Sequence, residues 1–210
     1  MEGSSVEFSG WREKLIDDKN FDKNVAYDFG KLIGHFENIN KDLDHINPYE
    51  FIAGIFEFTK AFFTLGSALS MGFSDITDKV KIWRTLFKVN YKDDVYCDLQ
   101  AVMEKEIQLN IHSLNGENNS KLGHKKAKSE YYEYTSGCRT IVRLSWFLNF
   151  LHNIFRNLLD TDDAFNSSLK KAYNEVLAPH HPWLVRKSVG VAFGFASSKR
   201  GPALKAFFGN

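Results

Sequence analysis

The sequence predicts an all-α protein. Apolar residues recur at spacings of three and four along most of the chain, and no segment shows the strict apolar–polar alternation of a half-buried strand. Only 4 Pro occur among 210 residues, which favours helices. Hydrophobic residues make up 43% of the chain and include 19 Phe, so its helices can enclose a large core.

Clusters of turn-forming residues separate the expected helices. "NINKDLDHINP", "NYKDD" and "DTDD" interrupt the apolar repeat with Asn, Asp and Pro. Between such breaks the repeat is regular, as in Ile76, Val80, Trp83 and Phe87. The expected helices cover residues 9–17, 24–40, 48–71, 75–89, 95–113, 138–159, 163–177 and 182–196.

Residues 51–73 resemble a membrane span in length and apolarity. Glu57 and Lys60 lie within this segment, however, and each charge near the middle of a bilayer costs about 2.5–3.5 kcal/mol on insertion scales. We therefore interpret the segment as a buried helix of the core.

The longest break in the helical pattern is residues 115–129, which are polar and rich in Lys. One interpretation is a solvated insertion between two helices. The other is a basic patch that meets anionic lipid headgroups, where each Lys adds about 1 kcal/mol. No repeat or linker divides the chain, so we expect one domain over residues 1–210.

The composition and the missing motifs exclude several classes of function. A formal net charge of +1 gives no overall field that would attract nucleic acid. Cys97 and Cys138 form no CxxC pair, and the adjacent His180 and His181 cannot both face one metal from a helix surface. Nucleotide-binding, zinc-protease and nucleophile-elbow motifs are absent from the sequence. We therefore predict no enzyme activity, no cofactor and no metal site.

The cellular context is predicted from the same features. The first residues lack the apolar region of a signal peptide, and the low Cys content fits a reducing compartment. We expect a cytoplasmic protein, and because no dimer signal is evident, a monomer.

The stretch "GCRTIVRLSWF" places Arg139 and Arg143 four residues apart in the first turns of an expected helix. Like charges at this spacing repel, and cations there oppose the helix dipole. A compensating anion is needed. It could be a carboxylate of the protein, or a phosphate or carboxylate of a ligand, which guanidinium groups bind with paired hydrogen bonds.

Two further stretches carry polar groups beside apolar stripes. In "SDITDKV", Asp75 and Lys79 form either an ordinary surface pair or the edge of a cavity. In "APHHPWLVRKSVGVAF", Pro182 begins a helix with His181 at its mouth. Trp183 would ordinarily belong to the core, but beside basic residues it could instead anchor the protein to a membrane.

The stretches "LGSALSMGFSDITDKVKI", "GCRTIVRLSWFLNFLHNIF" and "APHHPWLVRKSVGVAF", in this order, resemble the glycolipid transfer protein superfamily over residues 25–206. The resemblance implies a two-layer sandwich of about eight helices that encloses a collapsible apolar pocket. It also implies a sphingolipid ligand, with its headgroup at the surface and its chains inside.

The resemblance further implies roles for individual residues. Asp75 corresponds to the residue that accepts the ceramide amide N–H, and His181 to the one that donates to the ceramide carbonyl. Glycolipid-binding members have Asn and Trp where this chain has Lys79 and Arg143. Together with Arg139, these cations match the ceramide-1-phosphate branch and imply a phosphate site.

Cations also suit a phosphate on physical grounds, because a phosphomonoester carries about −1.5 to −2 charges, whereas a sugar is neutral. Trp183 is the expected membrane contact. The residues expected to line the space for the lipid chains are Phe62, Leu65, Val80, Trp83, Phe147, Phe150 and Ile154.

The sequence thus predicts a non-vesicular sphingolipid carrier that binds ceramide-1-phosphate-like lipids and contacts membranes transiently. One alternative is a carrier of glycolipids or of mixed specificity. Another is a lipid-sensing regulatory protein with little transfer activity.

Overall fold

The computed structural model describes residues 21–39, 45–65, 73–90, 94–116, 134–196 and 198–208. The expected helix at 9–17 and most of the 115–129 segment lie outside these ranges. Within them the structure is helical, and the only bridge of β type is an isolated one between Asn115 and Thr135. The all-α prediction is confirmed.

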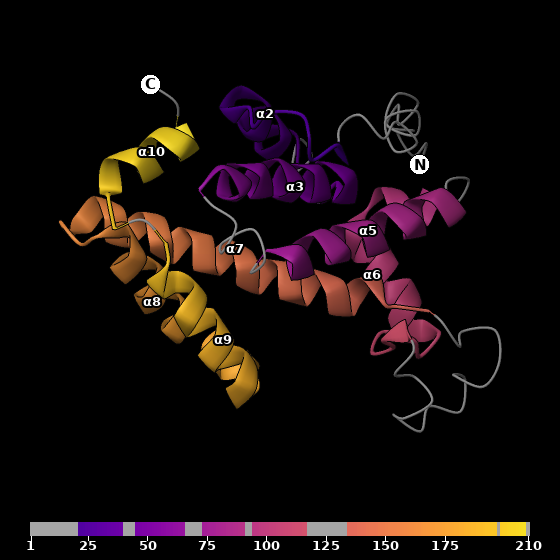
Figure 1. Cartoon of the computed structure of the whole chain (residues 1–210). Coiled ribbons are helices and arrows are strands. Elements are labelled where there is room, and N and C mark those ends of the chain that lie inside the picture. Colours follow the sequence, from indigo (N-terminus) through magenta and orange to yellow (C-terminus); the bar gives the residue numbers. More distant parts are fainter. Residues whose placement is uncertain are drawn as a thin grey trace.

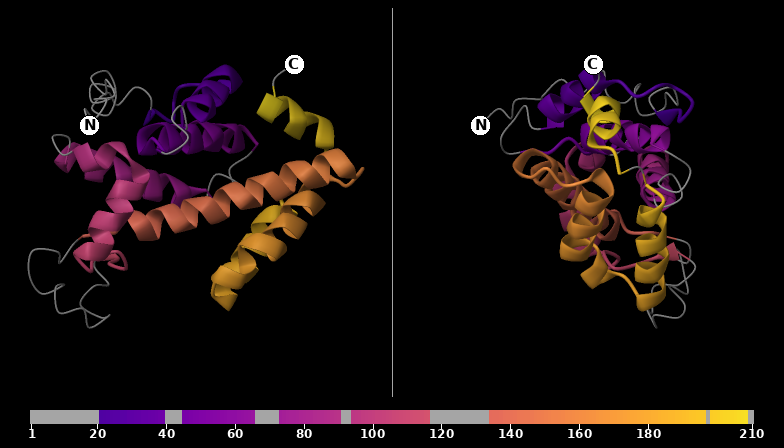
Figure 2. Two further views of the ribbon diagram at one scale, coloured as in Figure 1. Left: turned by 180° about the vertical axis from the view of Figure 1, so that it is seen from behind. Right: turned by 60° about the vertical axis from the view of Figure 1, so that its left-hand side comes forward.

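Eight α-helices form two layers in the described part of the chain. In Figure 1, α7 runs across the molecule with α2, α3 and α10 on one side and α8 and α9 on the other. Figure 2 shows the same layers from behind and from the side. The α-helices are α2 (Phe29–Ile39), α3 (Pro48–Thr64), α5 (Ser74–Val89), α6 (Leu99–Gln108), α7 (Gly137–Asp160), α8 (Phe165–Val176), α9 (Trp183–Gly194) and α10 (Arg200–Phe208).

Two regions differ from the expected helices. The segment expected at 95–113 consists of a 3-10 turn, η2 (Asp94–Cys97), and of α6, whose N-terminus is capped by the Asp98 side chain. The helical pattern ends there because Asn110 adopts a left-handed conformation with φ 55°. Helix α10 was not among the expected helices, and it contains Gly201 and Pro202. Both lie in the first turn, where Pro removes no helical hydrogen bond.

The core is centred on α3. From Pro48 to Phe62 every residue except Phe51 is buried, because α2, α5 and α10 all pack against this helix. Asn47 starts α3 by accepting the backbone N–H groups of Tyr49 and Glu50. In the part of the chain that the structure describes, no helix combines the length and apolarity needed to cross a membrane.

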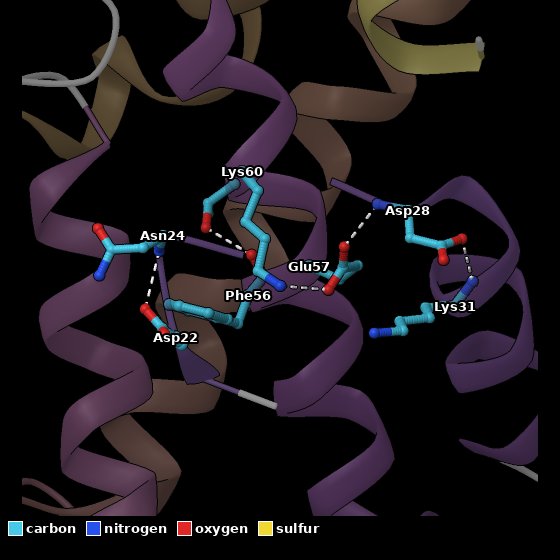
Figure 3. A network of polar contacts seen from close by, with 8 residues as sticks. Asp22, Asn24, Asp28, Lys31, Phe56, Glu57 and Lys60 are labelled. Atoms are coloured by element: carbon cyan, nitrogen blue, oxygen red, sulfur yellow. Dashed lines mark hydrogen bonds and ion pairs between the residues drawn. The ribbon is translucent and has the colours of Figure 1, made fainter. Parts of the chain in front are cut away.

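A buried ion pair lies in the middle of α3 (Figure 3). Glu57 is 2% exposed and Lys60 is 3% exposed, and Lys60 Nζ donates to Glu57 Oε2 at 2.7 Å. The other oxygen, Oε1, accepts the Asp28 N–H at 2.8 Å and so ties α3 to the segment before α2. Burial, followed by the charges of Glu57 and Asp28, raises the pKa of Tyr27 to about 12.

We predict that Lys60→Met lowers the free energy of unfolding by about 3–5 kcal/mol, because it leaves the Glu57 carboxylate buried without a cation. The double variant Glu57→Leu/Lys60→Met should lose less, since no charge remains. Urea denaturation measures both. Lys81→Met, which removes the exposed Lys81–Asp78 pair, is the control and should change stability little. A double variant less stable than Lys60→Met would contradict this prediction.

Candidate functional site

A cavity of about 510 Å³ opens between the start of α5, the middle of α7, and the end of α8 with the following turn and α9. Its wall combines apolar and aromatic residues with a smaller polar group, called here the polar edge because the exposed Asp75 belongs to it. The polar residues are Asp75, Lys79, Arg143, His180 and His181. The apolar residues and the remaining rings are Phe73, Ile76, Trp146, Phe147, Phe150, Tyr173, Leu177, Val185, Val189 and Phe193.

Asp75 and Lys79 form an ion pair on the first turns of α5. The Lys79 ammonium also donates to the Asp75 carbonyl at 3.3 Å. The pair is asymmetric, because Lys79 is 8% exposed while the Asp75 side chain faces solvent. Both residues line the cavity, so the pair lies at a cavity edge and is not an ordinary surface pair.

The two arginines on α7 lie close together. Arg143 lines the cavity and donates from Nη1 to the Arg139 carbonyl at 3.3 Å, whereas Arg139 lies outside the wall of the cavity. Burial and then the charge of Arg143 lower the pKa of Arg139. Within the described ranges, neither guanidinium forms an ion pair with a carboxylate. The positive charge of this helix face is thus not neutralised by these residues.

A carboxylate does lie at the start of α7, but it binds other groups. Glu106 on α6 is buried and accepts the backbone N–H groups of Gly137 and Cys138 at 2.6 and 2.9 Å. It also accepts the hydroxyls of Ser136 and Tyr134. The sequence left open whether an internal carboxylate would pair with the arginines, and Glu106 instead satisfies the helix terminus. No sequence pattern marks this contact, which joins residues about 30 positions apart.

His181 lies in the cavity wall and bonds to Tyr173, whose hydroxyl is 2.8 Å from His181 Nδ1. Burial lowers the pKa of His181, the Asp75 charge opposes this effect, and the Lys79 charge adds to it. The imidazole therefore shares an electrostatic environment with the ion pair on α5. No cluster of three metal-binding side chains occurs among the described residues.

Trp146 and His180 form a parallel stack that links α7 to the turn after α8. Their ring centroids are 3.6 Å apart and the planes differ by 5°. Both rings line the cavity next to the polar edge. Neither residue was predicted to belong to the site, because the stack depends on the meeting of two segments that are distant in the sequence.

Of the residues expected to line the space for lipid chains, Phe147 and Phe150 lie in the cavity wall. The others do not line it. Phe62, Val80, Trp83 and Ile154 are in the closed core, and Leu65 packs against that core. Additional wall residues come from α8 and α9, including Tyr173 and Phe193.

Trp183 begins α9 and is 60% exposed. Leu184 beside it is also exposed, and Lys187 places its ammonium 4.1 Å from the centroid of the Trp183 ring. This end of α9 thus presents apolar side chains and a cation to solvent, close to Val185 in the cavity wall.

The model of the glycolipid transfer protein family matches residues 46–204, so the chain belongs to this family. A zebrafish (Danio rerio) ceramide-1-phosphate transfer protein is 32% identical over 170 residues, which are 80% of this chain and 74% of that protein. A rat (Rattus norvegicus) protein of the same name is 31% identical over 62% of this chain and 56% of its own length.

The fold is shared with solved structures of the family. The crystal structure of the human ceramide-1-phosphate transfer protein in complex with 2:0 ceramide-1-phosphate superposes with a TM-score of 0.70. The match has 24% identity and covers 87% of this chain and 81% of that chain. The predicted family and its helical sandwich are confirmed.

We predict that the protein becomes less stable as the pH falls, and that part of this loss depends on His181. Its pKa lies below the ordinary 6.5 in the folded state, so the unfolded chain binds the proton more readily. The stability that the neutral ring contributes is complete above the ordinary pKa of 6.5, and it is lost as the pH falls from there towards the lower pKa of the folded state. In urea unfolding, His181→Gln should reduce the fall in unfolding free energy below about pH 6.5.

His152→Gln, at an exposed histidine that does not line the cavity, is measured beside it as the control. An unchanged slope in His181→Gln would show that this ring is not held neutral by the fold.

Proposed function

We propose that this protein is a non-vesicular carrier that binds ceramide-1-phosphate or a close relative and moves it between membranes without altering it. The observation that carries this proposal is the charge at the cavity edge. Lys79 and Arg143 line it and Arg139 adjoins Arg143, while Asp75 is the one carboxylate in the described wall. The edge is thus positive and lies next to an apolar cavity.

A phosphomonoester matches this edge. It carries about −1.5 to −2 charges at neutral pH, and guanidinium groups bind its oxygens with paired hydrogen bonds. Around a neutral sugar, the cations would repel one another without compensation. The names of the zebrafish and rat relatives, and the lipid in the human structure, support the same headgroup.

Asp75 and His181 are the proposed contacts of the ceramide amide. One Asp75 oxygen pairs with Lys79, which leaves the other to accept the amide N–H. When the Tyr173 hydroxyl donates to His181 Nδ1, the ring proton is on Nε2, which then donates to the ceramide carbonyl. The lowered pKa of His181 favours this neutral ring.

The lipid chains would occupy the apolar cavity and the space behind it. Phe147 and Phe150 form the wall, and the residues expected from the sequence lie behind them in the same core: Phe62, Leu65, Val80, Trp83 and Ile154. Each CH₂ shielded from water contributes about 0.8 kcal/mol. Wider separation of the two layers would admit both chains.

Contact with the membrane is proposed at the start of α9. Trp183 and Leu184 are exposed beside Arg186 and Lys187, which suits insertion at an anionic interface. The carrier would work in the cytoplasm, associate with membranes transiently, and need no cofactor or energy source, so net flow would follow the lipid gradient.

We predict that Arg143→Ala lowers the transfer of ceramide-1-phosphate between vesicles by about tenfold or more, because the variant loses one charge-assisted hydrogen bond to the phosphate. Arg156→Ala, which truncates an exposed arginine on the same helix, should have no effect.

The double variant Lys79→Asn/Arg143→Trp should shift the headgroup preference towards glucosylceramide. Equal wild-type transfer of both lipids would support a carrier of mixed specificity, and tight binding without transfer would support a sensor.

We predict that Trp183→Ala reduces the binding of the protein to anionic vesicles by about tenfold, because a large apolar side chain no longer enters the interface. Sedimentation with vesicles measures this binding. Leu159→Ala, which truncates an exposed apolar residue on α7, is the control and should bind as the wild type does. Loss of binding in both variants would argue against α9 as the docking helix.

A further inference from the structure

The C-terminal helix places one large ring in the core. Phe207 on α10 is 0% exposed and lies beyond residue 204, where the match to the family model ends. Its ring stacks on Phe58 with centroids 5.6 Å apart and meets Phe155 and Phe165 edge-on at 5.2 and 6.1 Å. The last residues of α10, which lie beyond the family match, therefore contribute a central part of the packing.

A row of aromatic rings connects the cavity to Phe207. Phe147 and Phe73 line the cavity, with centroids 5.5 Å apart. Phe73 contacts Phe62 on α3 at 4.0 Å, and Phe62 contacts Phe207 at 4.9 Å. Phe207 is thus the fourth ring of this row and the second one beyond the cavity wall.

The row is a continuous line of ring contacts that leads from the cavity wall into the core. An acyl chain could extend the cavity along this row. Contacts between the rings would then be replaced by contacts between rings and methylene groups, so little apolar surface would be exposed to water. Space is the limiting factor, because a packed core admits added volume only where side chains can yield.

We infer that Phe207 is the end stop of the chain pocket: its ring closes the deep end of the acyl-chain space and sets the longest chain that fits. This inference rests on the proposed function. Figure 1 shows α10 at the end of α3, over the C-terminal half of α7.

A hydrogen bond fixes the backbone of α10 at Phe207. Tyr27 donates its hydroxyl to the Phe207 carbonyl at 2.8 Å, and Ala203 is the other buried residue of the helix. Phe208 is 45% exposed, and its ring contacts Phe29 at 5.6 Å and Phe155 at 5.4 Å but no ring of the row that leads from the cavity. Neighbouring phenylalanines thus differ in position, which provides a matched control.

The test compares three probes: 2:0, 12:0 and very-long-chain ceramide-1-phosphate. Binding is measured by native mass spectrometry and transfer by exchange between vesicles. Phe207→Ala opens space at the end of the row, so the preference for the very long chain over the 12:0 chain should rise about tenfold or more, given about fourfold per additional buried CH₂. Phe208→Ala should leave this preference unchanged.

Phe207→Trp provides a change of opposite sign, since a larger ring should shorten the longest chain that is accepted. If Phe207→Ala does not fold, Phe207→Trp and Phe207→Leu together provide the test. Binding of the 2:0 lipid should be the same in all variants, because that lipid does not reach the stop.

The outcomes separate the two proposals. Failure of the wild type to bind any of the three lipids would overturn the proposed function. Normal binding of the 2:0 lipid, with chain preference unaltered in the Phe207 variants, would overturn the end stop and leave the proposed function intact.

Discussion

The start of α7 is held by a single buried carboxylate, and the candidate site depends on it. Glu106 accepts two N–H groups of this helix terminus and the Ser136 hydroxyl, which also caps Arg139 N–H. Gly137 permits the approach, because a Cβ there would lie 3.0 Å from the Trp83 ring and 3.2 Å from Glu106. Helices α5, α6 and α7 therefore meet at one point, and Arg143 on α7 lines the same cavity as the Asp75–Lys79 pair on α5.

Negative charge in this part of the molecule is divided between two tasks. The Glu106 carboxylate satisfies backbone groups that would otherwise lack partners in the interior. The Asp75 carboxylate pairs with Lys79 at the cavity edge. Neither neutralises the arginines in the described contacts, so a positive face persists where an apolar cavity reaches the surface. This combination suits a ligand that is anionic at one end and apolar at the other.

Most helices could be predicted from the sequence because each buries a stripe with helical spacing, as Ile76, Val80 and Trp83 do on α5. The convergence of Asp75, Lys79, Arg143 and His181 was expected from their resemblance to family motifs, and the cavity includes all four. Helix α10 was not predicted, because Gly and Pro in a first turn look the same in sequence as a break.

Other parts of the site have no sequence signal. The contacts of Glu106 and the stack of Trp146 on His180 join segments about 30 residues apart, and spacing along the chain carries no information on such meetings. The same holds for the position of Phe62 and Trp83 behind the cavity wall. Their apolar periodicity predicts burial, but not which buried rings border a space.

The Trp146–His180 stack has a consequence for selectivity. By packing the turn before His181 against the helix that carries Arg143, it holds two of the proposed ligand contacts at a fixed separation. The conformational entropy of ordering them is lost during folding and need not be lost again on association. Such a preorganised pair would select ligands by the distance between an anionic headgroup and an amide. A phosphorylated lipid that lacks the amide, or carries it elsewhere, would leave one group unsatisfied and be rejected.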